Sequence, residues 1–294
     1  MNTREHRSSF IAHRSSFALP RGRTLTIPRP PGVMGVINVT PDSFSDGGVH
    51  LDHAKAVHAA LQMEQDGALV IDIGGESTRP GSEPIAAQTE IDRVVPVIEQ
   101  TRQRSDVPIS IDTQKGAVAD GALKAGADII NDVSALRYSA GMPAIAARAK
   151  VPVILMHMRG VPSTMQENIQ YDDVVSEVGS ELTAFRDAAV AAGVDASQIL
   201  IDPGIGFGKT FDHNLELLAR ASELTPIAPL VIGASRKGFI GHLTGREAGP
   251  DRSMGSLAAV AAAHRAGATL VRVHDVRETI DFLKVLTAIA EKER

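Results

Sequence analysis

Residues able to bind a ligand stand at the ends of short apolar runs along this 294-residue chain. Eight runs end in this way, at Asn38, Asp72, Asp112, Asn131, His157, Asp202, Ser235 and Arg272. Carboxylates in this set can accept pairs of adjacent N–H groups, and arginine can bind phosphate oxygens in pairs. The combination predicts a site for an anionic ligand that also carries a polar, heterocyclic edge.

Asp112, Asn131 and Asp202 form the acidic and amide part of this set. A single Asp after a strand often only caps the next helix. Three such residues at equivalent positions are better explained by a shared ligand. A ring with an amino-pyrimidinone edge offers the adjacent N–H groups that a carboxylate accepts in pairs.

A basic group occurs mainly late in the chain, and its members are Arg79, Arg236, Lys237, Arg272 and His274. Arg272 and His274 flank Val273, so strand alternation places both side chains on one side. Arginine favours paired contacts with phosphate oxygens. This group predicts a phosphate or diphosphate site.

A repeated fold must bring these residues together. Apolar runs occupy 33–38, 68–73, 108–112, 128–132, 152–157, 199–202, 229–234 and 269–274. Stretches of helical length follow at 52–66, 87–103, 115–125, 141–149, 172–192, 212–223, 253–266 and 276–291. Eight strand–helix units predict an α/β fold, a (β/α)8 TIM barrel whose strand ends meet at one mouth. A doubly wound open sheet is the alternative, but no GxGxxG follows the first strand.

The N-terminal region precedes these units. Residues 1–16 and the following Phe contain HRSSF twice, and this polar duplication predicts a disordered tail over 1–16. Residues 17–27 predict a hairpin with Gly22 at its turn, placed to cover the bottom of the barrel. We therefore expect one domain over 17–294.

Composition excludes several classes of function. A net charge of −5 and 22% charged residues indicate a soluble globular protein. A pI near 6.1 and the absence of Trp argue against nucleic-acid binding. Without cysteine, neither disulfides nor thiolate chemistry is possible. No 18-residue apolar run and no apolar signal segment occur, so we expect no membrane span and a cytoplasmic location.

Three loops are rich in glycine. The loops 40–48 and 74–84 are candidate lids, with tolerated surface loops as the alternative. PGIGFGKT at 203–210 resembles a P-loop, but its Gly spacing is too short, which argues against nucleotide binding. With no nucleophile elbow, HExxH or CxxC motif, chemistry would depend on positioning and leaving-group stabilisation. His157 could be structural.

Eight ordered segments carry a family resemblance: MGVINVTPDSFSDGG (34–48), DIGGESTRPG (72–81), SIDT (110–113), INDVSA (130–135), LMHMRGVPSTMQ (155–166), IDPGIGFGKT (201–210), GASRKGFIG (233–241) and RVHDV (272–276). From about residue 17 onward, the chain resembles the dihydropteroate synthases of folate biosynthesis. The resemblance implies condensation of 6-hydroxymethyl-7,8-dihydropterin diphosphate with 4-aminobenzoate, giving 7,8-dihydropteroate and diphosphate. It also implies Mg²⁺, a homodimer and membership of a group targeted by sulfonamides.

The same resemblance implies residue roles. The residues implied to hold the pterin are Asp112, Asn131, Asp202 and Lys237. Those implied to bind the diphosphate are Arg79, Arg272 and His274, with Asn38 at the Mg²⁺. Those implied to shape the aminobenzoate pocket are Thr78, Pro80, Ser235, Lys237, Phe44 and Phe207. Catalysis would rest on Asp112, Lys237, Arg272 and Arg79. Gly238 departs from the family pattern, in which Ser often follows the Lys.

The implied reaction needs no strong base, because an aromatic amine is already nucleophilic. Mg²⁺ and the arginines would stabilise the leaving diphosphate. Asp112 and Asp202 would favour positive charge on the pterin methylene, which predicts a dissociative displacement.

Three alternatives stay open. A corrinoid-linked, pterin-binding methyltransferase would not need the STRP loop or the late basic group. A catalytically silent pterin-binding paralogue would be expected to break the STRP and SRK motifs, which are intact here. A sugar-phosphate barrel enzyme would not explain Asp112, Asn131 and Asp202 together.

Overall fold

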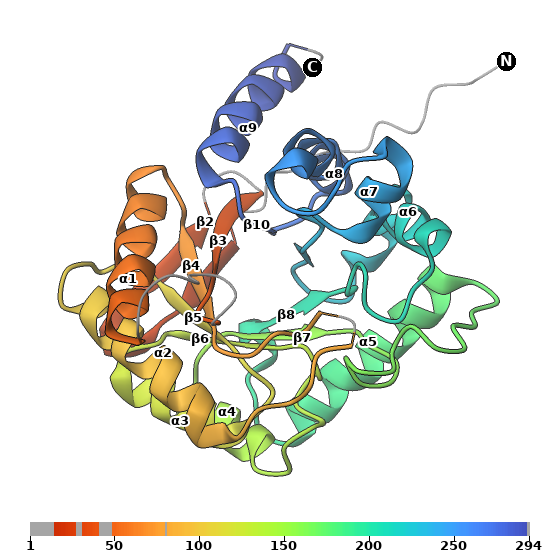
Figure 1. Ribbon diagram of the computed structural model, residues 1–294. Helices are drawn as coiled ribbons and strands as arrows, with labels where there is room; N and C mark the ends of the chain where they lie inside the picture. Colours follow the sequence, from red (N-terminus) through yellow and green to blue (C-terminus); the bar gives the residue numbers. More distant parts are fainter. Residues whose placement is uncertain (1–14, 28–30, 41–48, 80, 293–294) are drawn as a thin grey trace, which may run out of the picture.

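A computed structural model describes residues 15–27, 31–40, 49–79 and 81–292 of the chain. The first 14 residues of the expected tail, together with Phe44 and Pro80, lie outside the described residues. A two-stranded antiparallel sheet and an eight-stranded parallel sheet make up the strands (Figure 1). In the described ranges, no helix is long and apolar enough to cross a membrane.

The parallel sheet is the wall of a (β/α)8 barrel, as the eight apolar runs predicted. Its strands are β3 (Gly32–Asn38), β4 (Val70–Gly74), β5 (Ile109–Asp112), β6 (Ile129–Asp132), β7 (Val153–Met156), β8 (Ile199–Asp202), β9 (Val231–Ile232) and β10 (Leu270–Val273). They follow the order β8-β7-β6-β5-β4-β3-β10-β9. A parallel bridge between Ile201 and Leu230 joins the two ends and closes the ring.

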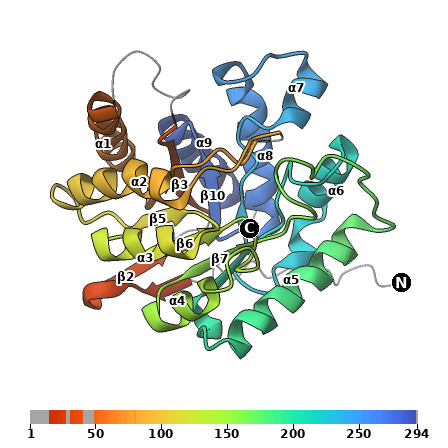
Figure 2. The same cartoon turned by 60° about the horizontal axis from the view of Figure 1, so that its bottom comes forward.

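Helices form an outer layer around these strands (Figures 1 and 2). They are α1 (Val49–Gln65), α2 (Ala87–Arg102), α3 (Gly116–Ala125), α4 (Met142–Ala149), α5 (Val174–Ala191), α6 (Phe211–Ala219), α7 (Gly238–Thr244), α8 (Ser253–Ala266) and α9 (Val276–Ala290). The sequence did not predict α7. The helix expected over 212–223 ends at Ala219, and a 3-10 turn over Ala221–Leu224 follows. Gly126 and Gly267 end α3 and α8 with φ of 116° and 79°, which glycine adopts without strain.

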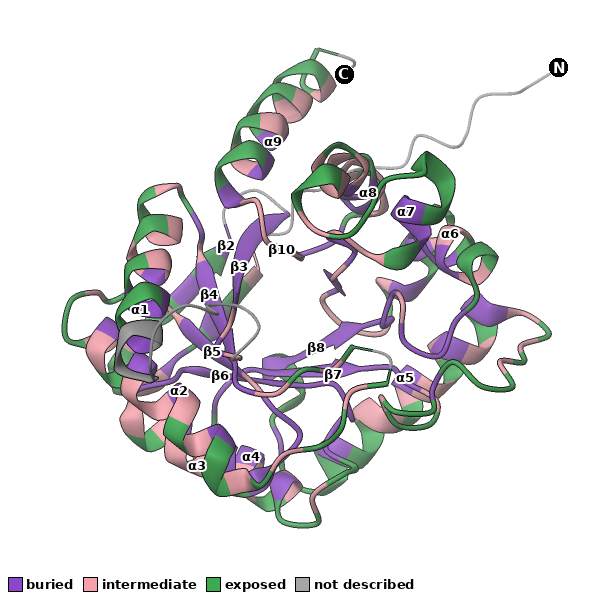
Figure 3. Ribbon diagram, in the orientation of Figure 1, coloured by how far each residue is buried: buried purple, intermediate pink, exposed green. Residues whose placement is uncertain are grey.

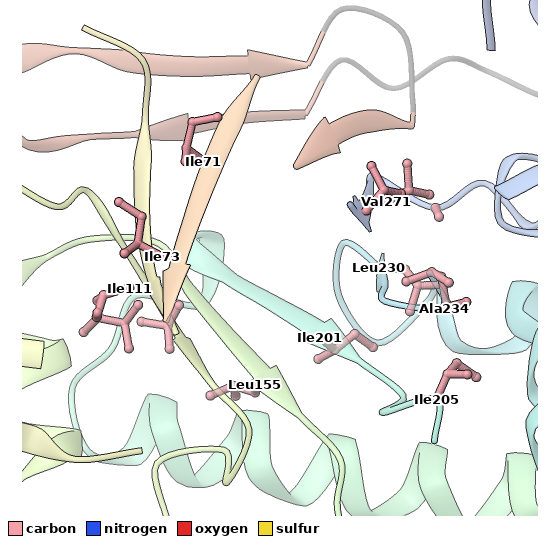
Figure 4. Packing of buried hydrophobic residues seen from close by; sticks show 14 of the residues in the cluster. Ile71, Ile73, Ile111, Leu155, Ile201, Ile205, Leu230, Ala234 and Val271 are labelled. Carbon is pink, nitrogen blue, oxygen red and sulfur yellow. The ribbon is translucent and has the colours of Figure 1, made fainter. Parts of the chain in front are cut away.

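Burial follows this layered plan. The strands and the inner faces of the helices are buried, whereas the outer helix faces are exposed (Figure 3). Alternate strand residues such as Ile71, Ile73 and Ile111 point outward into the space between strands and helices (Figure 4). These β-branched side chains suit a parallel sheet that is covered on both faces.

The N-terminal hairpin covers the bottom of the barrel, as predicted. It consists of β1 (Ser15–Ala18) and β2 (Thr24–Ile27), so it begins two residues before the predicted boundary at 17. Its Phe17, Leu25 and Ile27 pack against residues from the beginnings of the barrel strands. The polar residues at the other strand ends are therefore on the opposite side of the barrel from the hairpin.

Candidate functional site

A pocket of about 340 Å³ lies at the carboxyl ends of the strands. Several lining residues are those expected from the sequence: Thr78, Asp112, Asn131, Asp202, Phe207, Lys237 and Arg272. A second hollow, of about 1030 Å³, lies between α5 and residues 220–227 on the outside of the barrel, away from these strand ends. Only the first therefore combines the predicted acidic and basic groups.

Strand register explains how distant segments build this pocket. Asn38 on β3 pairs with Gly74, Gly74 with Asp112, and Asp112 with Asn131. Partners in neighbouring strands point to the same face of a sheet. The register therefore aligns Asn38, Asp112 and Asn131 in one row across four strands.

Arg272 is the centre of the charged network. Its Nε donates to Oδ2 of Asp72 over 2.6 Å, and its Nη2 donates to Oδ2 of Asp112 over 2.6 Å. The side-chain amide of Asn131 donates to the same oxygen of Asp72 over 3.1 Å. Asp72 is fully buried and orients two predicted ligand-binding side chains. The sequence marked it as a strand end but gave it no role in the site.

Burial shifts the proton affinities of the acids. It raises the pKa of Asp112 to about 7, although Arg272 opposes the shift. It also raises the pKa of Asp202, against the hydrogen bond that the backbone N–H of Gly204 donates over 2.7 Å. Oδ1 of Asp112 is buried and has no hydrogen-bond partner in the described part of the protein. A buried acceptor of this kind calls for a donor, which a bound ligand could supply.

Lys237 faces these acids from the loop after β9. Burial, and then the charge of Arg272, lower the pKa of Lys237 to about 8. Its Nζ lies 4.2 Å from the ring centroid of Phe207, a cation–π contact. The pocket is thus lined by an ammonium group, an aromatic ring and carboxylates.

Other predicted residues lie around the rim. Ser235 is buried, and its Oγ lies 3.1 Å from Nδ1 of His274. Burial, helped by Arg236 and Arg272, lowers the pKa of His274 to about 4, so this imidazole is neutral. Arg79 is exposed and forms no ion pair within the described segments.

Arg236 does not join the basic group, contrary to the sequence expectation. Its Nε donates to Oδ2 of Asp275 over 3.1 Å, and its Nη2 also binds that carboxylate. Its φ of 58° turns the backbone at this position. The pairing with Asp275 satisfies the guanidinium beside α9 instead of in the pocket.

Asn38, at the end of β3, is the residue implied to hold Mg²⁺. Among the described residues, no group of three or more His, Cys, Asp or Glu side chains could hold a metal ion. Mg²⁺ often takes only one or two protein oxygens and completes its shell with water and substrate phosphates. The amide oxygen of Asn38, at the end of β3, fits a metal ion that arrives with a phosphate ligand.

Comparisons with known proteins identify the family of the chain. A family model described as "Pterin binding enzyme" matches residues 34–274. Dihydropteroate synthase of Escherichia coli is 46% identical over 260 residues, which cover 88% of this chain and 91% of that protein. The Synechocystis enzyme is 45% identical, covering 87% of this chain and 89% of its own.

Solved structures give the same result. Xanthomonas albilineans dihydropteroate synthase with 4-aminobenzoic acid has a TM-score of 0.88 and 46% identity, covering 94% of this chain and 98% of that one. The Yersinia pestis enzyme in a sulfonamide complex has a TM-score of 0.88 and 44% identity, covering 94% and 99%. By sequence and fold, this chain belongs to the pterin-binding enzyme family and, within it, to the dihydropteroate synthases.

Proposed function

We propose that this protein is a transferase of folate biosynthesis that joins 6-hydroxymethyl-7,8-dihydropterin diphosphate to 4-aminobenzoate and releases diphosphate. One observation carries the proposal: Asp112, Asn131 and Asp202 share a pocket with Lys237 and Arg272. Related structures from Xanthomonas albilineans hold 4-aminobenzoic acid or 7,8-dihydropteroate.

The pterin ring would lie against the acids. Oδ1 of Asp112 has no partner in the described residues, so it can accept N–H donors from the ring edge. Asn131 is held by Asp72, which fixes where its own amide oxygen points. Asp202 and Lys237 would complete the ring site from the other strands.

The diphosphate would lie toward Arg272, Arg79 and His274. Arg272 is already anchored by Asp72, and Arg79 is free to approach an anion because it is exposed. Asn38 would hold Mg²⁺, which when bound would neutralise charge on the leaving diphosphate. His274, neutral and bonded to Ser235, can donate one N–H to a phosphate oxygen.

The aminobenzoate would bind nearer the loops. Thr78 and Phe207 line the pocket, and Ser235 and Lys237 follow β9 on its other side. Pro80 and Phe44, which lie outside the described residues, would complete the benzoate site by resemblance. An aromatic wall and an ammonium suit an aromatic carboxylate.

The reaction would be a dissociative displacement. The bond between the methylene carbon and the diphosphate oxygen breaks with its electron pair left on oxygen. The amine lone pair then forms the new C–N bond, and the surplus amine proton passes to solvent. Asp112 and Asp202 stabilise positive charge on the pterin methylene during this step. A large secondary deuterium isotope effect at the methylene is expected, and a value near unity would exclude this mechanism.

A coupled assay for diphosphate release tests the function. Release should require both substrates and should yield 7,8-dihydropteroate. Complementation of a folate auxotroph separates an enzyme from a silent pterin-binding paralogue. Absence of turnover together with corrinoid-dependent methyl transfer would support the methyltransferase alternative instead.

Assembly and location are proposed as well. Large apolar side chains are exposed on α8 and α9, with Met254 at 76%, Val285 at 62% and Ile289 at 54%. Exposed apolar surface of this kind often marks a contact between proteins. We therefore propose a homodimer that uses these helices, and a cytoplasmic location.

A further inference from the structure

The loop after β8, residues 203–210, contains the lysine that resembles a P-loop lysine. Lys209 is only 2% exposed, so it does not face the pocket mouth. Its Nζ lies 3.0 Å from Nδ1 of His157 and 2.9 Å from the carbonyl oxygen of Phe207. A third acceptor, the carbonyl oxygen of His157, lies at 3.5 Å. The lysine therefore binds its own loop and the end of β7, not a phosphate.

The hydrogen bonds define how the protons are placed. Nε2 of His157 lies 3.1 Å from Oε2 of Glu181 on α5. A neutral imidazole that donates to Glu181 through Nε2 leaves Nδ1 to accept from Lys209. Burial lowers the pKa of His157 to about 4, in agreement with a neutral ring. Burial also lowers the pKa of Lys209 to about 7, but its three N–H groups all have acceptors.

The chain of contacts continues from Glu181 and returns to the same loop. Arg159 donates from Nε to Oε1 of Glu181 over 2.9 Å. The guanidinium of Arg159 lies 4.0 Å from the ring centroid of Tyr171. The hydroxyl of Tyr171 donates to the carbonyl oxygen of Gly208 over 3.2 Å. We call the set Lys209, His157, Glu181, Arg159 and Tyr171 the anchoring network.

The backbone of the loop packs closely against the residue that follows β7, His157. Gly204 has a φ of 68°, and a Cβ there would come within 2.0 Å of the carbonyl oxygen of His157. The side-chain amide of Gln166 donates to the carbonyl oxygen of Gly206 over 2.9 Å. Three successive carbonyl groups of the loop, at Gly206, Phe207 and Gly208, therefore each accept a hydrogen bond from a side chain.

These hydrogen bonds hold Phe207 in a position where its ring lines the pocket. It is 8% exposed, lines the pocket and lies under the ammonium of Lys237 at 4.2 Å. Its own carbonyl oxygen is the one that Lys209 holds. A displacement of this peptide unit would move the ring away from Lys237.

We propose that Lys209 is a positioning residue that acts through Phe207 to fix the aromatic wall of the 4-aminobenzoate site. This inference rests on the proposed function, because it assigns Phe207 to that site. In this proposal the residues of the anchoring network act without contacting the substrates. They hold a loop whose glycines would otherwise leave it mobile.

A double-mutant cycle tests the proposal in the full-length chain. Steady-state constants are measured for wild type, Lys209→Met, Phe207→Ala and the double variant. Lys209→Met should raise the KM for 4-aminobenzoate about tenfold, with kcat changed by less than about threefold. In the Phe207→Ala background the same substitution should change KM by less than about twofold, because residues that act in series are non-additive. If the two substitutions instead change KM independently, so that their fold-changes multiply in the double variant, the proposal is overturned.

Further variants keep the test decisive. Lys209→Gln retains a donor for the Phe207 carbonyl and should restore part of the wild-type KM. Lys124→Met removes an exposed lysine on α3 and should leave every constant unchanged. If Lys209→Met fails to fold, Tyr171→Phe replaces it in the cycle, because it removes only the bond to Gly208. Additivity of Tyr171→Phe with Phe207→Ala would then overturn the proposal.

The experiment distinguishes failure of the proposed function from failure of the proposed role of Lys209. A wild-type protein that forms no 7,8-dihydropteroate would remove the proposed function. An active wild type with a multiplicative cycle would remove only the role of Lys209. If Lys209→Met instead weakens binding of the pterin diphosphate but not of 6-hydroxymethyl-7,8-dihydropterin, Lys209 binds phosphate and the positioning role is excluded.

Discussion

Arg272 donates from Nε to Oδ2 of Asp72 across the interior of the barrel, over 2.6 Å. The same guanidinium binds Asp112 through Nη2, so one cation is shared by two carboxylates. Asp72 is fully buried, whereas the side chain of Asp112 is 12% exposed at the pocket. Arg272 therefore supports the fold through one acid and the site through the other.

Arg272→Ala should lower the stability of the fold and weaken ligand binding at the site. Two buried carboxylates would lose their counter-ion, which should lower the free energy of unfolding by about 3 kcal/mol. Burial already raises the pKa of Asp112 to about 7, so this acid is neutral well below that pH and charged above it. The loss of stability should thus be larger at about pH 8 than at about pH 5. Urea unfolding at the two pH values measures it, and equal losses would contradict the argument.

The same variant should bind pterin diphosphate more weakly by about 1.5–3 kcal/mol, through loss of a charge-assisted hydrogen bond. Binding of 4-aminobenzoate to the variant should change far less. Arg272→Lys keeps the charge but not the two-acid geometry, and it serves as the control. Unchanged diphosphate affinity by calorimetry would show that this cation does not contact the leaving group.

Pterin binding should release a proton from Asp112. In the free protein burial raises the pKa of this acid to about 7, and N–H donors from a ring favour its ionised form. At about pH 6, binding of 6-hydroxymethyl-7,8-dihydropterin should therefore release up to about one proton, and affinity should rise as pH rises. At about pH 8 the acid is largely ionised, so little release is expected. Calorimetry in buffers of different ionisation enthalpy counts these protons.

Asp112→Asn provides the matched test for this acid. An amide cannot accept two adjacent N–H bonds, so the variant should lose pterin binding while the fold is retained. Proton release of the same size at about pH 6 and pH 8 would argue against Asp112 as the group that titrates.

Much of the barrel and its mouth could be predicted from the sequence. The apolar runs of four to six residues end in polar side chains at or near the ends of the strands, so Asp112, Asn131 and Asp202 were found by pattern alone. The helix α7 was missed because its seven residues follow a Gly- and Arg-containing loop without a helical repeat.

Contacts between distant residues could not be predicted in this way. Asp72 meets Arg272 across a separation of 200 residues, and only the closed barrel brings them together. The direction of Arg236 depends on a backbone φ of 58° and on Asp275, and neither has a sequence signature. Strand ends are thus predictable, whereas the pairing among them depends on the three-dimensional register.

Asp128→Asn should destabilise the bottom of the barrel without affecting the mouth. Asp128 is fully buried and accepts from Arg102 over 2.6 Å, from Arg21 over 2.7 Å, and from Arg23. Loss of the charge should lower the free energy of unfolding by about 2–3 kcal/mol. This loss is smaller than for a fully buried ion pair because Arg21 is partly exposed to solvent. KM and kcat should stay at wild-type values. Asp120→Asn, in a surface ion pair, should change stability by less than about 0.5 kcal/mol. A changed KM would indicate that the two ends of the barrel are coupled.

Charge on α9 should separate the proposed homodimer. Val285 and Ile289 are exposed by 62% and 54%, and a glutamate at each would oppose burial against a second copy. Analytical ultracentrifugation of Val285→Glu/Ile289→Glu should show monomers where the wild type sediments as a dimer. Val190→Glu, on α5 at 40% exposure, should leave the dimer intact. A double variant that remains dimeric would place the interface elsewhere.

The loop after β4 suggests that the substrates bind in a fixed order. Its base is anchored, because Oε1 of Glu76 accepts from Lys115 over 2.8 Å and from the backbone N–H of Ile85 over 2.8 Å. Further along the loop, Arg79 is exposed and has no ion-pair partner in the described residues. A bound diphosphate can attract this guanidinium, and Thr78 moves with it because the two are adjacent.

4-Aminobenzoate should therefore bind weakly to the free protein and at least about tenfold more tightly once pterin and diphosphate are present. Arg79→Gln should remove most of this enhancement but leave pterin binding intact, because the ring contacts lie on the strands. Calorimetric titration of 4-aminobenzoate with and without pterin and diphosphate measures the coupling. Equal affinities in the two titrations would mean that the benzoate pocket is already formed, and the order of addition would then be random. Glu76 is anchored at the base of the loop, whereas Arg79 has no ion-pair partner among the described residues, so the arrangement favours a loop that completes its pocket only around an anion.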